Sequence, residues 1–273
     1  MSDLSLALWQ RAPAPWSAQE FLCALEAAVA KTGAHVFVTN ELCWPGYGDA
    51  QQSTAEAVTR DSPLIVAVQA IAARQSKAIV LGYAEKDGAH VFNSAICIDS
   101  NGVILANYRK QTAANDYESS CFARGGCGSV FLLNGIPTSI LICMDVEFPE
   151  LVRRASLDGA QLLIVPTALA PKWRVIPEAV IPARAYENGI FIAYCNYAGQ
   201  DDIGQFCGQS LVAGPDGRAI VNAGSDSCIL EATINSDRVT AARSQLDYLQ
   251  HLEQLHCPPR PTTPKGRTIV VGG

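Results

Sequence analysis

Residues 138–150 read T-S-I-L-I-C-M-D-V-E-F-P-E, which predicts a buried strand running straight into a turn and then a helix. Residues 138–142 are rich in apolar and β-branched side chains. Cys143 follows at once, Asp145 can cap a helix, and Pro149 suits its first turn. A cysteine at such a turn faces backbone N–H groups and the positive end of a helix, which favour the thiolate and supply donors for an oxyanion. The segment therefore predicts a nucleophile elbow with sulfur in place of oxygen.

Cysteine usage gives Cys143 an alternative interpretation. The chain has ten cysteines, and free cysteine is among the most commonly buried residue types, so an inert core thiol is the competing reading of Cys143. The ten include no C-x-x-C pair and there are only four histidines, so we expect no metal site.

Composition places the chain among large globular α/β proteins. Its 273 residues are 49% apolar and 17% charged, which predicts a sizeable core. The net charge of −6 and the lack of a basic stripe argue against a nucleic-acid partner. No apolar run approaches the ~20 residues that cross a membrane. The amino-terminal M-S-D-L-S-L-A-L-W carries an acid where a secretory signal carries basic residues, which predicts a cytoplasmic protein with reduced thiols.

Strand and helix patterns alternate along the chain. A strand at residues 4–9, a helix at 17–31 and a strand at 35–39 suggest a crossover unit and a mostly parallel sheet. Asn101-Gly102 predicts a turn between two strands. We expect further strands at residues 78–84, 90–99, 103–109, 130–133, 161–167, 191–196 and 208–213, and helices at 54–75, 147–158, 175–188 and beyond 237.

Three chemically active residues each follow a predicted strand. Glu41, Lys110 and Cys143 stand at strand ends, where ligand sites form in α/β sheets. Taken singly, Glu41 could be a surface loop residue and Lys110 a solvated edge-strand lysine. The loop at 111–128 is long and poor in apolar residues, which is typical of a functional loop.

Together these motifs resemble the nitrilase superfamily of carbon–nitrogen hydrolases. The matching stretches are N-E-L-C-W-P-G-Y-G around Glu41, N-Y-R-K ending at Lys110, and L-I-C-M-D-V-E-F-P-E around Cys143. P-A-R-A-Y-E-N and G-Q-S-L-V-A-G-P-D-G extend the match to residues 4–235. The stretch N-Y-A-G-Q-D-D-I-G-Q-F-C-G-Q-S resembles the amidase-type members, the 5-aminopentanamidase and (R)-amidase group.

The resemblance implies an α/β fold, specifically an α-β-β-α four-layer sandwich of the nitrilase type. It implies a carbon–nitrogen hydrolase domain over residues 1–256, pairing into a homodimer or a higher homo-oligomer, and no cofactor. We expect the apolar tail at 257–273 to dock on the domain or on a partner subunit.

The resemblance also assigns catalytic roles. It implies Cys143 as nucleophile, Glu41 as general base and Lys110 as oxyanion stabiliser, cleaving a small aliphatic carboxamide to a carboxylate and ammonia through a thioester. An amide is a poor electrophile, so splitting its hydrolysis into two steps is chemically sensible. A further glutamate that orients the lysine in the family matches Glu118, with Asp116 as a competitor.

Substrate-binding residues are a separate expectation. Acids in the loop at Asp201 and Asp202 favour an amide carrying an amine, unless both are ordinary solvated side chains. The expected substrate-binding set is Tyr47, Asp116, Met144, Trp173 and Asp201.

Alternatives to an amidase use the same residues. A nitrilase or an N-carbamoyl-amine hydrolase could share the three catalytic groups, although nitrilases tend to follow the nucleophile with Trp-Glu, and here Met144 and Asp145 follow it. A non-catalytic binding protein of the same fold would be expected to lack one of the three. A thiol redox protein is disfavoured by the cysteine spacing, although Cys121 and Cys127 lie in the loop at 111–128.

Overall fold

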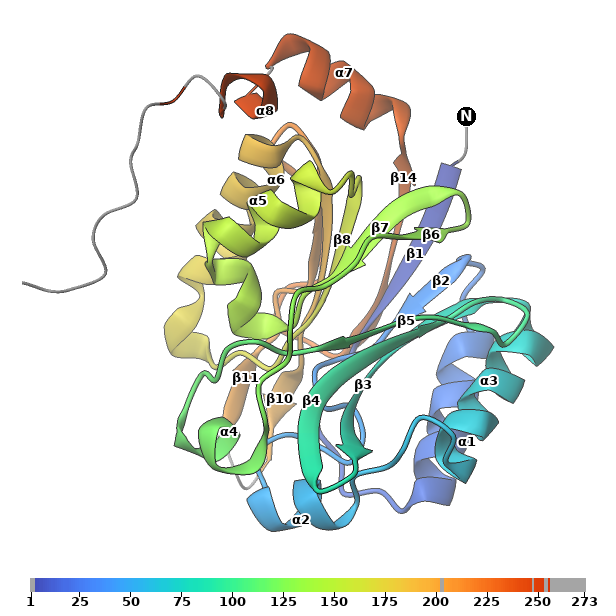
Figure 1. The fold of residues 1–273 in the computed structure, drawn as a ribbon. Coiled ribbons are helices and arrows are strands. Elements are labelled where there is room, and N and C mark those ends of the chain that lie inside the picture. Colours follow the sequence, from blue (N-terminus) through green and yellow to red (C-terminus); the bar gives the residue numbers. More distant parts are fainter. Residues whose placement is uncertain (1–2, 202–203, 247, 253–254, 256–273) are drawn as a thin grey trace, which may run out of the picture.

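The computed structural model describes residues 3–201, 204–246, 248–252 and 255. These residues form two six-stranded sheets that pack face to face, with helices on the outer face of each sheet (Figure 1). The predicted α-β-β-α sandwich is therefore confirmed. The tail at 257–273 and Asp202, for which the sequence predicted docking and binding roles, lie outside the described residues.

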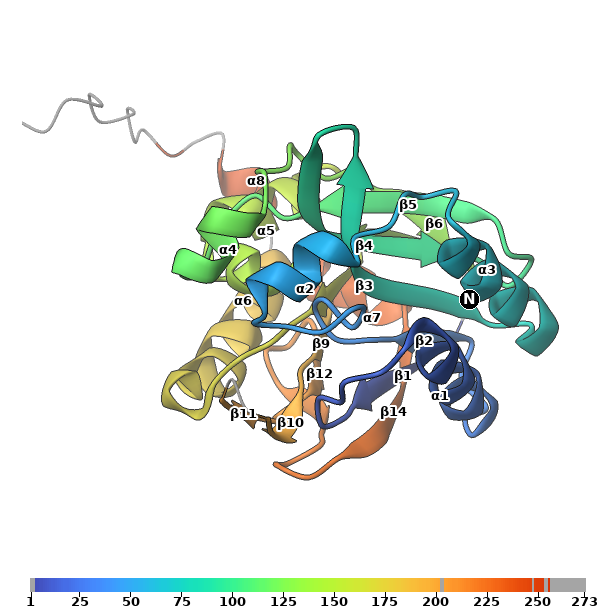
Figure 2. The same ribbon diagram turned by 90° about the horizontal axis from the view of Figure 1, so that it is seen from below.

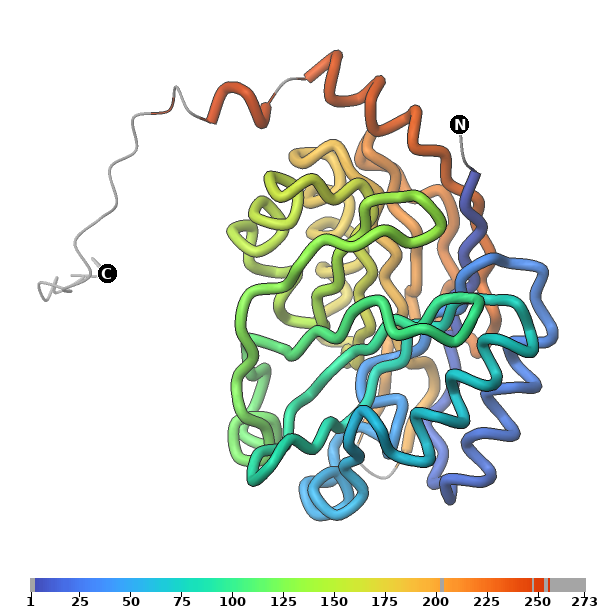
Figure 3. Tube along the Cα trace, turned by 45° about the vertical axis from the view of Figure 1, so that its right-hand side comes forward, coloured from blue at the N-terminus to red at the C-terminus, as the bar shows by residue number. Residues whose placement is uncertain are grey.

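The first sheet combines the amino-terminal half of the chain with its last strand. β2 pairs parallel with β1 and β3, whereas the other neighbours pair antiparallel. The expected mostly parallel sheet is thus wrong, because the hairpin at Asn101-Gly102 and the returning last strand reverse the chain direction. Figure 3 shows the first and last strands side by side. In spatial order the strands are β14 (Cys228–Asn235), β1 (Asp3–Gln10), β2 (Val36–Val38), β3 (Ala78–Asp87), β4 (His90–Ile98) and β5 (Ile104–Arg109).

The second sheet repeats this arrangement without a recognisable sequence repeat. Its β8 pairs parallel with β7 and β9, and the remaining neighbours pair antiparallel. In spatial order the strands are β13 (Ala219–Asn222), β12 (Leu211–Ala213), β9 (Phe191–Cys195), β8 (Leu162–Pro166), β7 (Ile136–Ile140) and β6 (Phe131–Leu133). A separate ribbon joins β10 (Ala198–Gln200) to β11 (Gln205–Cys207).

Two apolar layers hold the sandwich together. Along β1, Leu4, Leu6 and Leu8 point into the core between the sheets, while Ala7 belongs to the layer under the helices. This alternation follows from the two-residue period of a strand. Burial of these side chains fixes the distance between the sheets, and so fixes the strand ends that carry the candidate site.

Helices cover both outer faces, and Figure 2 shows the two pairs on opposite sides. The predicted cap at Ser17 is present, with its hydroxyl accepting from the N–H of Glu20. The expected helix at 54–75 is two helices, because Ser62 caps a new one that begins with Pro63. The first sheet carries α1 (Ala18–Ala30) and α3 (Pro63–Gln75), the second carries α5 (Pro149–Leu157) and α6 (Ile181–Asn188), and α2 (Ala50–Ala55), α4 (Asp116–Cys121), α7 (Asp237–Gln245) and α8 (Tyr248–His251) complete the set.

Short irregular helices mark the remaining departures from the expected pattern. The helix expected at 175–188 begins as a π-helix, η3 (Ile176–Val180), because Pro182 cannot donate to the preceding turn. Two 3₁₀-helices, η1 (Cys143–Glu147) and η2 (Pro171–Trp173), lie near the candidate site. None of the described helices has the length and apolar character of a membrane span.

Candidate active site

Cys143 is the first residue of η1 and lies at a sharp turn three residues beyond the end of β7. Ile142 is extended, with φ −121° and ψ 121°, whereas Cys143 has φ 47°, a left-handed conformation that is uncommon for a residue with a side chain. The thiol residue is 5% exposed. Strained backbone of this kind is concentrated at functional sites. The strand-to-turn part of the predicted elbow is therefore present.

The helix after Cys143 differs from the expected one. The residues after the cysteine form the tight 3₁₀-helix η1, and α5 starts only at Pro149, with Phe148 at its cap position. Asp145 therefore does not cap α5. Its buried carboxylate instead accepts from the Tyr108 hydroxyl at 2.7 Å and from the N–H of Thr112 at 3.0 Å.

Glu41 lies just beyond β2 and is fully buried. Its Oε1 accepts from Lys110 Nζ at 2.6 Å and from Asn93 Nδ2 at 2.8 Å, whereas its Oε2 has no partner among the described residues. Burial raises the pKa of Glu41 to about 7, since it outweighs the lowering by Lys110, and the Glu118 carboxylate adds to the rise. Glu41 is thus a carboxylate poised to hold or release a proton near neutral pH.

Lys110 extends from the end of β5 into the same buried space. Its Nζ lies 2.6 Å from Glu41 Oε1 and 2.7 Å from Glu118 Oε2, and the residue is 3% exposed. Burial acts to lower the pKa of Lys110, but the Glu41, Cys143 and Glu118 groups raise it above its ordinary value. The charged ammonium form is therefore favoured, and the burial of Lys110 excludes the solvated edge-strand interpretation.

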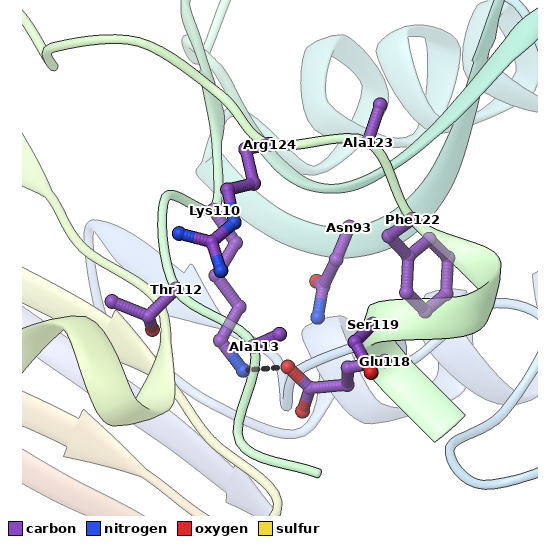
Figure 4. A pocket seen from close by; sticks show the side chains of 9 residues that line it. All are labelled: Asn93, Lys110, Thr112, Ala113, Glu118, Ser119, Phe122, Ala123 and Arg124. Atoms are coloured by element: carbon purple, nitrogen blue, oxygen red, sulfur yellow. Dashed lines mark hydrogen bonds and ion pairs between the residues drawn. The ribbon is translucent and has the colours of Figure 1, made fainter. Parts of the chain in front are cut away.

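Glu118 also contacts Lys110, with its Oε2 2.7 Å from the lysine Nζ (Figure 4). Its Oε1 accepts from the Tyr47 hydroxyl at 2.7 Å, and its Oε2 also accepts from the N–H of Ala114 at 3.1 Å. The loop at 111–128 forms the short helix α4 here, and Asn115 caps it by accepting from the N–H of Glu118. The competing acid, Asp116, is exposed and outside this contact.

These neighbours set the protonation state of Cys143. Burial raises the pKa of the thiol well above its ordinary value and Glu41 adds to the rise, whereas Lys110 and a hydrogen bond from the Ala168 backbone lower it. Burial therefore opposes the stabilisation of the thiolate that the turn was expected to provide. Burial and the Glu41 and Glu118 carboxylates raise the pKa of the thiol more than the Lys110 ammonium lowers it, so the thiol form is favoured and its attack requires a base.

Cys143 opens onto a cavity of about 470 Å³. Of the expected substrate-binding residues, Tyr47, Met144 and Trp173 line this cavity. Asp201 does not, because its carboxylate accepts from the N–H of Gly204 at 3.0 Å in the turn between β10 and β11. Asp116, exposed on α4, does not line it either.

A smaller cavity of about 110 Å³ lies along Lys110 and Glu118 (Figure 4). Asn93, Ser119 and Arg124 provide polar groups in its wall, and it shares no lining residue with the larger cavity. The Asn93 Oδ1 atom is buried without a partner among the described residues. Lys110 and Glu118 thus border a space of the scale of a few water molecules.

Several site residues were missed by the sequence analysis. Glu147, Lys172 and Phe206 also line the larger cavity. Asn93 was detectable in principle, because the predicted hairpin sets the register of β4 and β5, and the N–H of Lys110 donates to the carbonyl of Asn93 at 2.8 Å.

The described part of the site contains neither a cluster of metal-ligating side chains nor a disulfide. Across the described residues, no three histidine, cysteine, aspartate or glutamate side chains gather as metal ligands. All nine described cysteines are free, including Cys121 and Cys127, which do not line the larger cavity.

Comparison with known proteins is consistent with this geometry. The chain is 35% identical over 254 residues to the "Hydrolase in pqqF 5'region" of Pseudomonas protegens, covering 91% of this chain and 89% of that protein. It is 31% identical over 227 residues to an (R)-stereoselective amidase of a Pseudomonas species, covering 83% and 82% of the two chains.

A solved structure is similar over nearly the whole chain. The crystal structure of an amidase from Nesterenkonia sp. superposes with a TM-score of 0.80 at 32% identity, covering 90% of this chain and 96% of that one. In the structure of a glutamate-to-glutamine mutant of the amidase from Nesterenkonia sp. AN1, the active-site cysteine carries the acetamide moiety of fluoroacetamide. The carbon–nitrogen hydrolase family matches residues 6–244, and the chain belongs to that family.

Proposed function

We propose that this protein is a cysteine amidase that hydrolyses a small aliphatic carboxamide to a carboxylate and ammonia. One observation carries the proposal: Glu41 and Lys110 are in contact at 2.6 Å, and both act on the charge of a buried thiol, Cys143, that opens onto a substrate-sized cavity. The likeness to amidases, one with a covalent adduct on its active-site cysteine, supports the same reaction class.

In the first half-reaction, Glu41 is the general base. Its open Oε2 takes the proton from Cys143, and the sulfur forms a bond to the amide carbon. The negative charge that develops on the amide oxygen is stabilised by Lys110 Nζ and the N–H of Met144. The C–N bond then breaks, and Glu41 returns its proton to the departing ammonia, which leaves a thioester.

In the second half-reaction, the same groups act on water. Glu41 takes a proton from a water molecule, and the resulting hydroxide forms a bond to the thioester carbon. The C–S bond breaks and the sulfur recovers the proton. Glu118 touches no reacting atom in this scheme, and its contact at 2.7 Å positions Lys110.

Ammonia release from purified protein tests the proposal. We expect the wild type to release ammonia from butyramide, and Cys143→Ala to release none while keeping its circular dichroism spectrum and melting temperature. Intact-protein mass spectrometry with fluoroacetamide should detect a covalent adduct on the wild type only. Full activity in the alanine variant would refute the assignment, and faster turnover of butyronitrile than of any amide would make the enzyme a nitrilase.

We further propose that the protein acts in the cytoplasm as a homodimer or a larger homo-oligomer. Nine free cysteines support a reducing compartment. Leu157 of α5 and Tyr186 of α6 are 54% and 40% exposed on neighbouring helices of one outer layer, which supports burial of that layer against a second copy.

A further inference from the structure

We propose that Glu147 selects the substrate by binding a positively charged amine on the acyl chain of the amide. The proposal rests on the amidase function above and names the substrate class: short carboxamides that carry a primary amine. Acyl chains that end in a carboxylate are disfavoured by the same group.

Glu147 shares a rigid element with the proposed nucleophile. Cys143 is the first residue of the 3₁₀-helix η1 and Glu147 is its last, and both line the larger cavity. Among the described residues that line this cavity, Glu147 is the only one with a carboxylate. A substrate held over the sulfur therefore extends into a space whose described carboxylate is carried by the same short helix as that sulfur.

The carboxylate of Glu147 makes no hydrogen bond or ion pair with any described residue, which separates it from the other acids of the site. Arg184 donates to its backbone carbonyl at 2.8 Å. The same guanidinium pairs with the Glu187 carboxylate at 3.1 Å. Arg184 therefore holds the main chain of Glu147, but it forms its ion pair with Glu187. The Glu147 carboxylate is thus available to bind a ligand.

The surroundings strengthen an interaction with a cation. Glu147 is half-buried, and burial raises its pKa, with Lys110 and Arg184 opposing the rise. A partly desolvated carboxylate gains more from an opposite charge than a solvated one does. The cation in the cavity wall, Lys172, is exposed, so water and salt screen its effect on an anionic substrate.

Three matched substrate series test the selection. Each length of acyl chain is supplied as an ω-amino amide, as an unsubstituted alkanamide and as an ω-carboxy amide. For the wild type we expect kcat/KM to be highest for the amine and lowest for the acid. Glu147→Gln keeps the size and removes the charge. It should lower kcat/KM for the best amine by about ten-fold or more and leave the matched alkanamide nearly unchanged.

Two further arms separate the possible outcomes. Asp116→Asn removes an exposed acid outside the cavity, and it should leave the ranking of the three series as in the wild type. Calorimetric titration of Cys143→Ala with the amine and the alkanamide measures the preference without turnover, so it remains decisive even if the amidase activity itself is absent. Equal losses for the amine and the alkanamide in Glu147→Gln, or equal binding of both by Cys143→Ala, would overturn the proposal.

Discussion

The two carboxylate oxygens of Glu41 differ in their hydrogen bonding. Oε1 accepts two hydrogen bonds, from Lys110 and Asn93, and these favour the ionised form. Oε2 is buried and has no partner among the described residues, so it is the oxygen available for a transferred proton. The hydrogen bonds to Oε1 keep the carboxylate in one orientation while Oε2 gains and loses a proton.

The acid limb of the pH–rate profile should report Glu41. Its pKa is raised to about 7, and only the ionised form can accept the thiol proton. We therefore expect kcat/KM for a neutral amide to fall about ten-fold per pH unit below about pH 7, and to level off above it. Asn93→Leu removes a hydrogen bond to the ionised form, so the limb should move to higher pH. A flat profile from about pH 5 to pH 9 would contradict the role of Glu41.

At the scale of elements, the loop after β5 keeps Lys110 in place. Asp145 of η1 binds the backbone of Thr112, and Glu118 of α4 binds Lys110 directly. The N–H of Gly125 donates to the carbonyl of Lys110 at 2.8 Å, and a Cβ on Gly125 would lie 2.0 Å from the carbonyl oxygen of Arg109. Two separate parts of the loop therefore fix the strand end that carries the ammonium.

Two neighbouring acids of α4 give a matched test of this arrangement. Glu118→Gln removes a charge from the contact with Lys110, and a hydrogen bond between charged groups contributes about 1.5–3 kcal/mol. We expect kcat for a neutral amide to fall by about ten-fold or more, because about 1.4 kcal/mol corresponds to ten-fold in rate.

Asp116→Asn changes an exposed acid in the first turn of the same helix, and it should leave kcat near the wild-type value. A larger loss in Asp116→Asn than in Glu118→Gln would contradict the assignment.

Local sequence patterns predicted the elements of the site better than its electrostatics. The turn at Cys143 and the strand ends at Glu41 and Lys110 follow from short-range signals. The resting thiol does not, because burial and two carboxylates from distant segments raise the pKa of Cys143. Asp201 looked available in the sequence, but the turn that it stabilises takes up its carboxylate.

At the scale of the whole molecule, the fold was largely predictable and its strand directions were not. Alternating strand and helix patterns predicted the α/β class, and the family motifs predicted two sheets between helices. A parallel unit at the start of the chain suggested a parallel sheet, whereas β14 returns to pair antiparallel with β1. This pairing joins residues near opposite ends of the sequence, so local sequence patterns cannot predict it.

The exposed layer of α5 and α6 leads to a prediction about assembly. We expect the wild type to sediment as a dimer or a larger species. The double variant Leu157→Glu, Tyr186→Glu should shift the sedimentation coefficient toward that of a monomer, because it places charge on an apolar contact. Val66→Glu is the matched control, since Val66 is 53% exposed on α3 of the opposite outer layer. A wild type that sediments as a monomer would contradict the proposed oligomer.

The resting thiol at Cys143 has a consequence for the durability of the protein under oxidative stress. Peroxides attack the thiolate, and burial together with the Glu41 and Glu118 carboxylates raises the pKa of the Cys143 thiol, which opposes formation of that thiolate. Cys23 and Cys127 are exposed, so oxidants meet these surface thiols first. We therefore expect oxidation to reach these exposed cysteines before the proposed nucleophile.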